Sequence, residues 1–211
     1  MNFEKPDGPE TKQESPFSEL REKTYAEMEV ALKKRIKENP APTDHELRIG
    51  AYEEEIEPQM REALQRLYEK GYNTESSGFG GGEKWETQQV DGYFEIDEAT
   101  EKKLNEIGAR VVRQYMEYLH ATSTRIEFDP EQADAAAIVA KWNQIIDLLP
   151  TIGKPSYSLS APSYEFREKF LGEEEARRIQ IETAFEHGSM PDDEREQAAQ
   201  WLKEHPRKTN P

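Results

Sequence analysis

The chain has 211 residues, a net charge of −16 and no cysteine, which excludes disulfide frameworks, thiolate zinc sites and cysteine nucleophiles. No apolar run approaches the roughly 18 residues that a membrane span requires, and the polar first 17 residues are unlike a secretory signal. The 44 acidic residues outnumber the 28 basic ones, which argues against nucleic acid as a partner because such binding depends on cationic contacts with phosphate. We therefore expect an acidic, cytoplasmic protein that contacts neither a membrane nor a nucleic acid.

Prolines, glycines and apolar residues are distributed unevenly and divide the chain into four parts. With 34% hydrophobic residues there is material for one modest core and not for several. We expect a disordered tail at 1–17, an α+β core domain at 18–150, a linker at 151–163, and a C-terminal helical arm and tail at 164–211.

Three helices are predicted before the first strand. Residues 18–39 place apolar side chains on one stripe, and the Pro-Ala-Pro sequence that follows cannot continue a helix. Thr43 and Glu46 have the spacing of a capping box, so a second helix is expected from there to Glu57. The clearest pattern lies at 58–70, where apolar residues recur at i, i+3, i+4, i+7 and i+8 on one face.

Two strands follow, separated by a glycine-rich turn. Tyrosine and threonine favour a strand at 72–77, and the glycines at 78–82 interrupt it. The chain then resumes as a strand somewhere between Trp85 and Ile96, most clearly at 93–96. Asp97 is positioned to cap a short helix that ends at Gly108.

The same order then repeats. Residues 111–118 and 125–128 are predicted strands joined by a short polar connection, and Asp129 is expected to cap the helix that closes the core domain. The order αββαββ predicts an α+β fold: a four-stranded antiparallel sheet with helices against one face, in the order of a circularly permuted ferredoxin-like domain. N-terminal helices precede the sheet, and a C-terminal helical arm follows it with segments at 164–187 and 191–205.

The two hairpin ends are the predicted binding site. If every helix enters and leaves at one end of the sheet, both hairpin turns fall together at the other end, and loops on a rigid sheet commonly carry binding groups. His120 is the side chain there that exchanges protons most readily near neutral pH. Together with hydroxyls and glycine amides it would bind a small polar ligand; the alternative is a floppy turn and a solvated histidine. The candidate ligand-binding residues are Thr74, Ser76, Ser77, Phe79, Trp85, His120 and Thr122.

No motif in the sequence identifies a cofactor, a metal or a catalytic residue. The glycines at 78–82 lead into a strand and lack the Gly-Lys-Ser or Gly-Lys-Thr of a phosphate-binding loop. The glutamate runs at 53–57 and 173–175 fit solvated helix faces, because consecutive helical positions point in different directions. The four histidines are too widely spaced for a metal-binding motif. We expect no cofactor and no metal.

Two functions from different classes are compatible with these features. The first is a soluble protein-interaction or regulatory module without assembled catalytic machinery, whose partner is another protein or a second copy of the chain. The thin apolar stripes of the C-terminal arm favour it. The alternative is a small-ligand-binding domain or an enzyme that uses the hairpin end of the sheet, at 74–85 and 118–124. Whether the two hairpin ends meet distinguishes between them.

Overall fold

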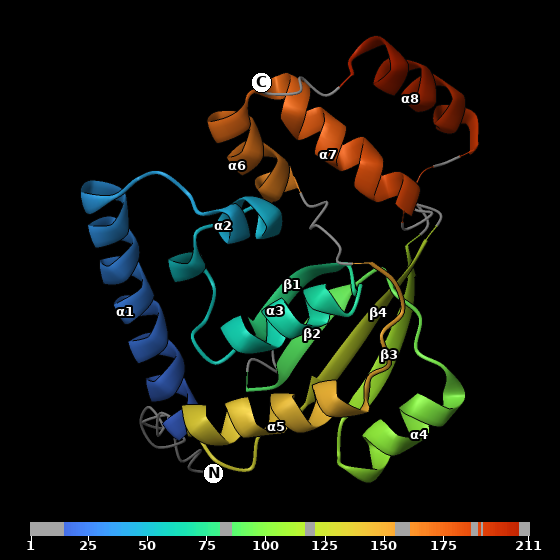
Figure 1. The fold of residues 1–211 in the computed structure, drawn as a ribbon. Coiled ribbons are helices and arrows are strands. Elements are labelled where there is room, and N and C mark those ends of the chain that lie inside the picture. Colours follow the sequence, from blue (N-terminus) through green and yellow to red (C-terminus); the bar gives the residue numbers. More distant parts are fainter. Residues whose placement is uncertain are drawn as a thin grey trace, which may run out of the picture.

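A computed structural model describes residues 15–80, 86–116, 121–154, 161–186, 190 and 192–206. In this part of the chain, helices cover one face of a single four-stranded sheet and lie beside its ends (Figure 1). The helices are α1 (Pro16–Glu38), α2 (Asp44–Ile49), the 3-10 helix η1 (Glu53–Glu55), α3 (Arg61–Glu69), α4 (Glu98–Glu106), α5 (Ala135–Leu148), α6 (Ala161–Leu171), α7 (Glu173–Glu186) and α8 (Asp192–Glu204). The strands are β1 (Thr74–Phe79), β2 (Gln88–Gly92), β3 (Arg110–Met116) and β4 (Ala121–Phe128). None of the helices within the described ranges is both long and apolar enough to cross a membrane.

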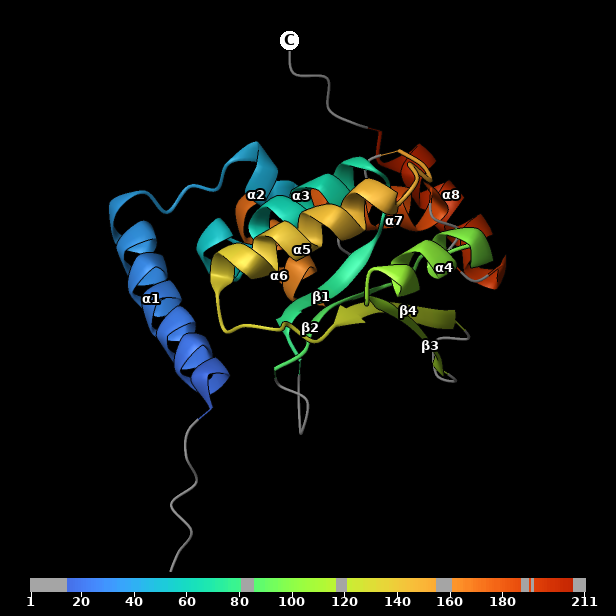
Figure 2. The same cartoon turned by 90° about the horizontal axis from the view of Figure 1, so that it is seen from below.

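The four strands form one antiparallel sheet in the order β1-β2-β4-β3. Figure 2 shows α3, α5 and α4 on the same side of this sheet. The predicted α+β fold is therefore confirmed, with its four-stranded antiparallel sheet, its N-terminal helices and its C-terminal helices; the circular permutation stays a prediction. The two edge strands are β1 and β3.

The hydrophobic core lies between the sheet and these three helices. Val90 of β2 and Ile126 of β4 face it, because alternate residues of a strand point to the same side of a sheet. From α5, Trp142 packs edge-on against Phe128 with 5.2 Å between the ring centroids. The one-faced patterns predicted from sequence for α3 and α5 are the stripes that enter this core. Its members from the helices and from the N-cap of α3 include Met60, Ala63, Leu67, Leu104, Ile138, Ile145 and Ile146.

Local capping determines where the second helix begins and ends. Thr43 and Glu46 form the predicted capping box, in which Glu46 N donates to Thr43 Oγ1 at 3.2 Å and Thr43 N donates to Glu46 Oε2 at 2.6 Å. The prediction that this helix continues to Glu57 is wrong, since α2 has six residues. Gly50 ends it with a φ of 72°, and a Cβ there would lie 2.2 Å from the Cβ of Ser163. This left-handed turn therefore requires glycine.

Long-range contacts move three boundaries within the core domain. β1 continues through 78–79, which were predicted as a turn. β2 lies within the predicted range from Trp85 to Ile96 but before 93–96, where the strand was expected to be clearest, because residues 88–92 are the ones that pair with both β1 and β4. The prediction that Asp129 caps α5 is wrong. Asp129 accepts a hydrogen bond from Thr87 Oγ1 at 2.6 Å, and Asp134 accepts from the first N–H groups of α5 instead.

The C-terminal region forms three helices where two segments were predicted. Gly172, with a φ of 84°, separates α6 from α7. α6 begins within the predicted linker at 151–163 and packs against the N-terminal helices. Tyr52 lies edge-on to Phe166 with 5.0 Å between centroids, and Arg167 donates hydrogen bonds to carbonyls at the end of α2. Phe166 of α6 therefore packs against the segment that follows α2.

Candidate functional site

The two hairpins point to opposite ends of the sheet. β2 is antiparallel to β4, with Gln88 beside Phe128 and Gly92 beside Thr124. The β1–β2 connection therefore lies at the end of β4 and the β3–β4 connection at its start, about 23 Å away at about 3.3 Å per residue. The prediction that both turns share one end is wrong, because α4 crosses the length of the sheet from the end of β2 to the start of β3 (Figure 1).

Of the candidates outside the start of β1, Thr122 and Phe79 are described, and they do not lie in a common site. Thr122 is exposed on β4, opposite Tyr115 of β3. Phe79 is buried at the end of β1, where its ring centroid lies 6.3 Å from that of Tyr25, so it is not an aromatic side chain presented on the turn. Trp85 and His120 lie outside the described residues.

A cavity of about 190 Å³ lies along the outer side of β1. Residues 74–77 form one wall, and the opposite walls come from the segment between α2 and α3, from α3 itself and from the start of α6, with apolar side chains such as Ile56 and Leu64. The Ser76 hydroxyl already donates to Asp91 Oδ2 at 3.1 Å. The cavity is smaller than the roughly 300 Å³ at which drug-sized ligand pockets begin. The candidates that it brings together are Thr74, Ser76 and Ser77, for which a ligand-binding role stays a prediction.

Glu57 is a buried carboxylate, and the prediction that the glutamate run at 53–57 lies on a solvated helix face is wrong for this residue, which follows η1 and lies outside any helix. It is 7% exposed and accepts hydrogen bonds from the Tyr25 hydroxyl at 2.9 Å, from Gln59 Nε2 at 2.6 Å and from Phe79 N at 3.2 Å. Burial raises the pKa of Glu57 above its ordinary value, although these donors and the nearby Arg21 oppose the rise. Because its donors come from α1, β1 and its own segment, this carboxylate fastens α1 to the sheet.

Gly78 is the sequence feature that could have indicated a close contact of the kind that Glu57 makes with β1. It has a φ of +108°, and a Cβ at this position would lie 2.4 Å from Glu57 Oε1. A glycine inside a strand often marks a close approach of another group to the backbone. The sequence shows that a glycine interrupts the predicted strand, but it does not show which group approaches that glycine.

The raised pKa of Glu57 predicts a stability that falls with pH. The unfolded chain loses this proton first, so the contribution of the protonated carboxyl is complete below the ordinary pKa of 4.5 and is lost as the pH rises through the folded value. We expect Glu57→Gln, which cannot ionise, to gain stability relative to wild type as the pH rises above 4.5, until the carboxyl has ionised in the folded protein as well. Urea denaturation at several pH values measures this difference.

Glu46 provides the control with the opposite sign. Its burial acts to raise its pKa, but the backbone N–H groups of Thr43 and Glu53 and the guanidinium of Arg35 outweigh burial and lower it. The contribution of Glu46 is therefore present above the ordinary pKa of 4.5 and is lost as the pH falls. Glu46→Gln should lose stability relative to wild type as the pH rises. The same trend in both variants would contradict the assignment for Glu57.

The second face of the sheet is open and carries paired charges. In Figure 2 no described helix lies over this face, although α1 runs beside the sheet and extends past it. Asp91 and Arg125 pair across β2 and β4 at 2.7 Å, and Arg110 and Glu127 pair across β3 and β4 at 3.1 Å. Val112, which is 40% exposed, lies opposite Arg125 on this face. Opposite charges on neighbouring strands keep the face close to neutral.

The two edges of the sheet differ in how they are protected. β1 has an irregular register near its start and borders the cavity. β3 pairs with β4 in unbroken register over its whole length, and no strand in the described part of the chain pairs with its outer side. Residues 112–115 are exposed in succession, with Tyr115 at 58%. A long, regular and exposed edge strand presents backbone N–H and C=O groups to which another strand can bond.

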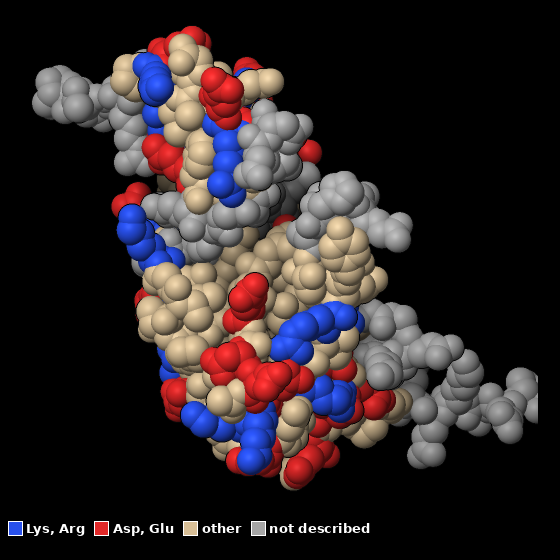
Figure 3. Space-filling model, turned by 90° about the vertical axis from the view of Figure 1, so that its right-hand side faces the viewer, with Lys and Arg blue, Asp and Glu red and all other residues tan. Residues whose placement is uncertain are grey.

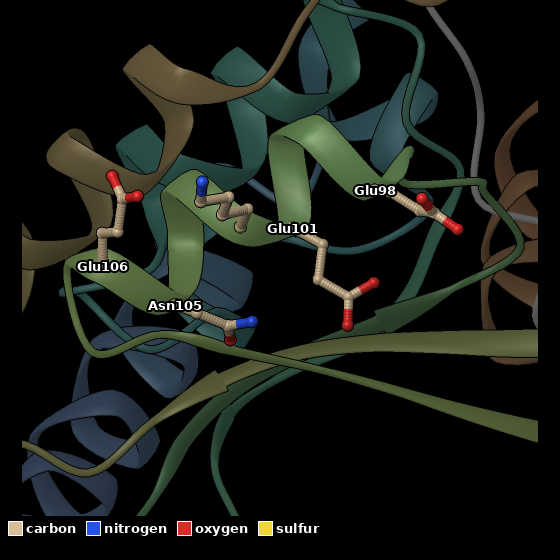
Figure 4. A pocket seen from close by; sticks show the side chains of 5 residues that line it. Glu98, Glu101, Asn105 and Glu106 are labelled. Carbon is tan, nitrogen blue, oxygen red and sulfur yellow. The ribbon is translucent and has the colours of Figure 1, made fainter.

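A hollow on α4 is lined by that helix alone. Figure 4 shows that Glu98, Glu101, Asn105 and Glu106 extend from it in different directions, with Lys102 among them. These side chains do not converge on one point. Across the described ranges, no three His, Asp or Glu side chains are grouped so that they could hold a metal ion.

The surface shown in Figure 3 mixes acidic and basic side chains. Its described residues form no continuous basic patch of the kind that nucleic acids bind. Comparison of the chain with protein-family models, curated proteins and solved structures finds no match.

Proposed function

We propose that this protein is a protein-interaction module that binds its partner along the free edge of β3. The observation that carries the proposal is the contrast between the two edge strands. The β1 edge is interrupted and bordered by other parts of the chain, whereas β3 is regular and exposed over residues 112–115. Folded proteins usually blunt such an edge with a bulge, a proline or a covering segment, because it invites pairing with another chain.

The composition of the open face is consistent with this function. Its charges are paired within the sheet, so a partner that contacts β3 and the neighbouring surface does not have to leave any of them unpaired. Val112 and Tyr115 add apolar surface on the two faces of the edge strand. A partner strand would gain backbone hydrogen bonds from β3 and side-chain contacts from these two residues.

Lysines placed on the edge test the proposal. Val112→Lys together with Tyr115→Lys should abolish binding of the partner while leaving the fold intact, because charged side chains on an exposed edge oppose strand addition. The control is Val30→Lys on α1, a residue that is 68% exposed and remote from the sheet edge. Proteins captured from cell extract by all three chains are compared, and the affinity of each candidate is then measured with purified components.

We expect to capture a protein that binds wild type and Val30→Lys with equal affinity. The edge variant should bind the same protein at least about tenfold more weakly. Circular dichroism and thermal unfolding establish that the edge variant is folded. Equal affinity of the folded edge variant for every captured protein would refute the proposed function.

A further inference from the structure

We infer that the partner of β3 is a second copy of this chain, paired through the same edge in antiparallel register about a two-fold axis at Gln114. The inference rests on the proposed function, because it names the chain that the free edge of β3 binds. It follows from the symmetry of strand pairing and from the side chains that this edge would place opposite each other.

An antiparallel strand edge is complementary to itself. The outward N–H and C=O groups of β3 can bond to the same groups of a second β3 that runs in the opposite direction. A two-fold axis perpendicular to the sheet relates two such strands, so the two four-stranded sheets become one continuous sheet with the helices of both copies on the same side (Figure 2). Symmetric dimers of this kind are the commonest soluble oligomers. The free edge therefore needs no other kind of chain to pair its backbone groups.

The exposed residues of β3 restrict the register of this pairing. Directly opposed residues of antiparallel strands share one face of the sheet, so the axis has to pass between two copies of the same residue. Residues 112–115 are exposed in succession, and β3 extends from Arg110 to Met116. All four exposed residues find opposite residues within the partner's β3 only when the axis lies at Arg113 or at Gln114.

The side chains decide between these two registers. An axis at Arg113 would place the two arginines opposite each other, and like charges in that position are destabilising. An axis at Gln114 instead places Arg113 opposite the partner's Tyr115, a residue that is 58% exposed, within reach of a cation–π contact. It also places the two Gln114 side chains opposite each other, where each amide can donate to the carbonyl of the other. The register is therefore assigned to the axis at Gln114.

The charges near the edge do not prevent this pairing. Arg113 Nη2 lies 2.8 Å from Glu101 Oε2, so the charge of this arginine is already compensated. The hollow on α4 carries both signs of charge, with Lys102 as well as Glu98 and Glu106. The net charge of −16 on each copy opposes association, but at physiological ionic strength this repulsion is screened beyond about 8 Å. It therefore affects the salt dependence of the dimer more than its geometry.

Single-cysteine variants test the register, because the chain has no cysteine of its own. Oxidation of Gln114→Cys should give a disulfide-linked dimer, since directly opposed residues have their Cβ atoms about 4.5–5.5 Å apart. The matched control is Val112→Cys, on the same face of β3, whose two copies would be about 13 Å apart. Arg113→Cys reports the rejected register. The linked dimers are measured on non-reducing gels over a dilution series.

Sedimentation of the unmodified chain tests the dimer itself. Wild type should show a species of twice its 24.4 kDa that dissociates on dilution. Val112→Lys together with Tyr115→Lys should weaken the dimer at least about tenfold, and circular dichroism establishes that this variant is folded. Raising the salt concentration from about 0.01 M to about 1 M should strengthen the wild-type dimer, because the range of the repulsion falls from about 30 Å to about 3 Å. A dimer that salt weakens would contradict this account of its charges.

The outcomes separate this inference from the proposed function. A dimer that depends on the β3 edge supports both, and the protein captured from extract is then expected to be a second copy of this chain. A monomer at every concentration, combined with edge-dependent capture of a different protein, overturns the second copy and leaves the interaction module standing. A dimer that the folded lysine variant still forms overturns the pairing through β3. Cross-linking through Val112→Cys or Arg113→Cys in preference to Gln114→Cys overturns the register. If neither a dimer nor partner capture depends on the edge, both proposals fail.

Discussion

Arg167→Met is expected to detach α6 from α2 and to lower the free energy of unfolding by about 2–4 kcal/mol. Arg167 is 1% exposed; its Nε donates to Leu47 O at 2.8 Å and its Nη2 donates to Arg48 O at 2.6 Å. These carbonyls belong to the last turn of α2, where backbone acceptors lack helical partners. Methionine fills a similar volume but donates nothing, so buried carbonyls would be left unpaired.

Urea denaturation followed by circular dichroism measures the loss, and limited proteolysis shows whether α6 becomes accessible. The matched control is Lys169→Met, the same replacement for an exposed cation on the same helix. Its expected effect is within about 0.5 kcal/mol of zero. Comparable stability of the two variants would show that Arg167 does not hold the C-terminal helices in place.

Trp142→Ala is expected to cost about 3–5 kcal/mol of stability, whereas Trp142→Phe should cost much less. Trp142 is fully buried on α5 and packs against Phe128. Its indole N–H has no hydrogen-bond partner among the described residues, so phenylalanine loses no protein hydrogen bond and keeps an aromatic ring against Phe128. Alanine removes the ring and leaves a cavity at the centre of the core.

Chemical denaturation followed by far-ultraviolet circular dichroism compares the two variants without relying on tryptophan emission. A Trp142→Phe variant as unstable as Trp142→Ala would contradict this account. It would show that the indole N–H contributes a buried hydrogen bond, for which an ordered water is the expected partner.

The elements that sequence predicted well are those specified by neighbouring residues. The capping box of Thr43 and Glu46 and the cap at Asp97 depend on contacts three residues apart, and both are present. The apolar stripes of α3 and α5 identify the core because a helix shows its buried face every three to four residues.

The failures come from contacts between distant parts of the chain. Asp129 has the composition of a helix cap, but Thr87 and Arg110 bind it to the sheet. Glu57 and Arg167 look like ordinary charged helix residues until their partners, 22 and about 120 positions away, are known. No pattern among neighbouring residues in the sequence indicates such a long-range hydrogen bond.

The expectation that both hairpin turns lie at one end of the sheet failed for a related reason. The hydroxyl residues of β1 were identified, and the structure gathers three of them at one cavity. The expectation that these residues lie beside the second hairpin depended on the direction in which α4 crosses the sheet. Helix periodicity gives the buried face of a helix but not the end of the sheet to which it leads. The free edge of β3 likewise depends on strand order, which the separate strand patterns do not contain.

The opposed directions of the two hairpins have a practical consequence for engineering. Phe79 and Gln88 flank one reversal, and Met116 and Ala121 flank the other, at the far end of the sheet. A fluorescent protein or an affinity tag inserted at the first reversal would therefore project away from the second. Two reporters carried in this way would bracket the long axis of the sheet and measure its extension directly, for example under mechanical load.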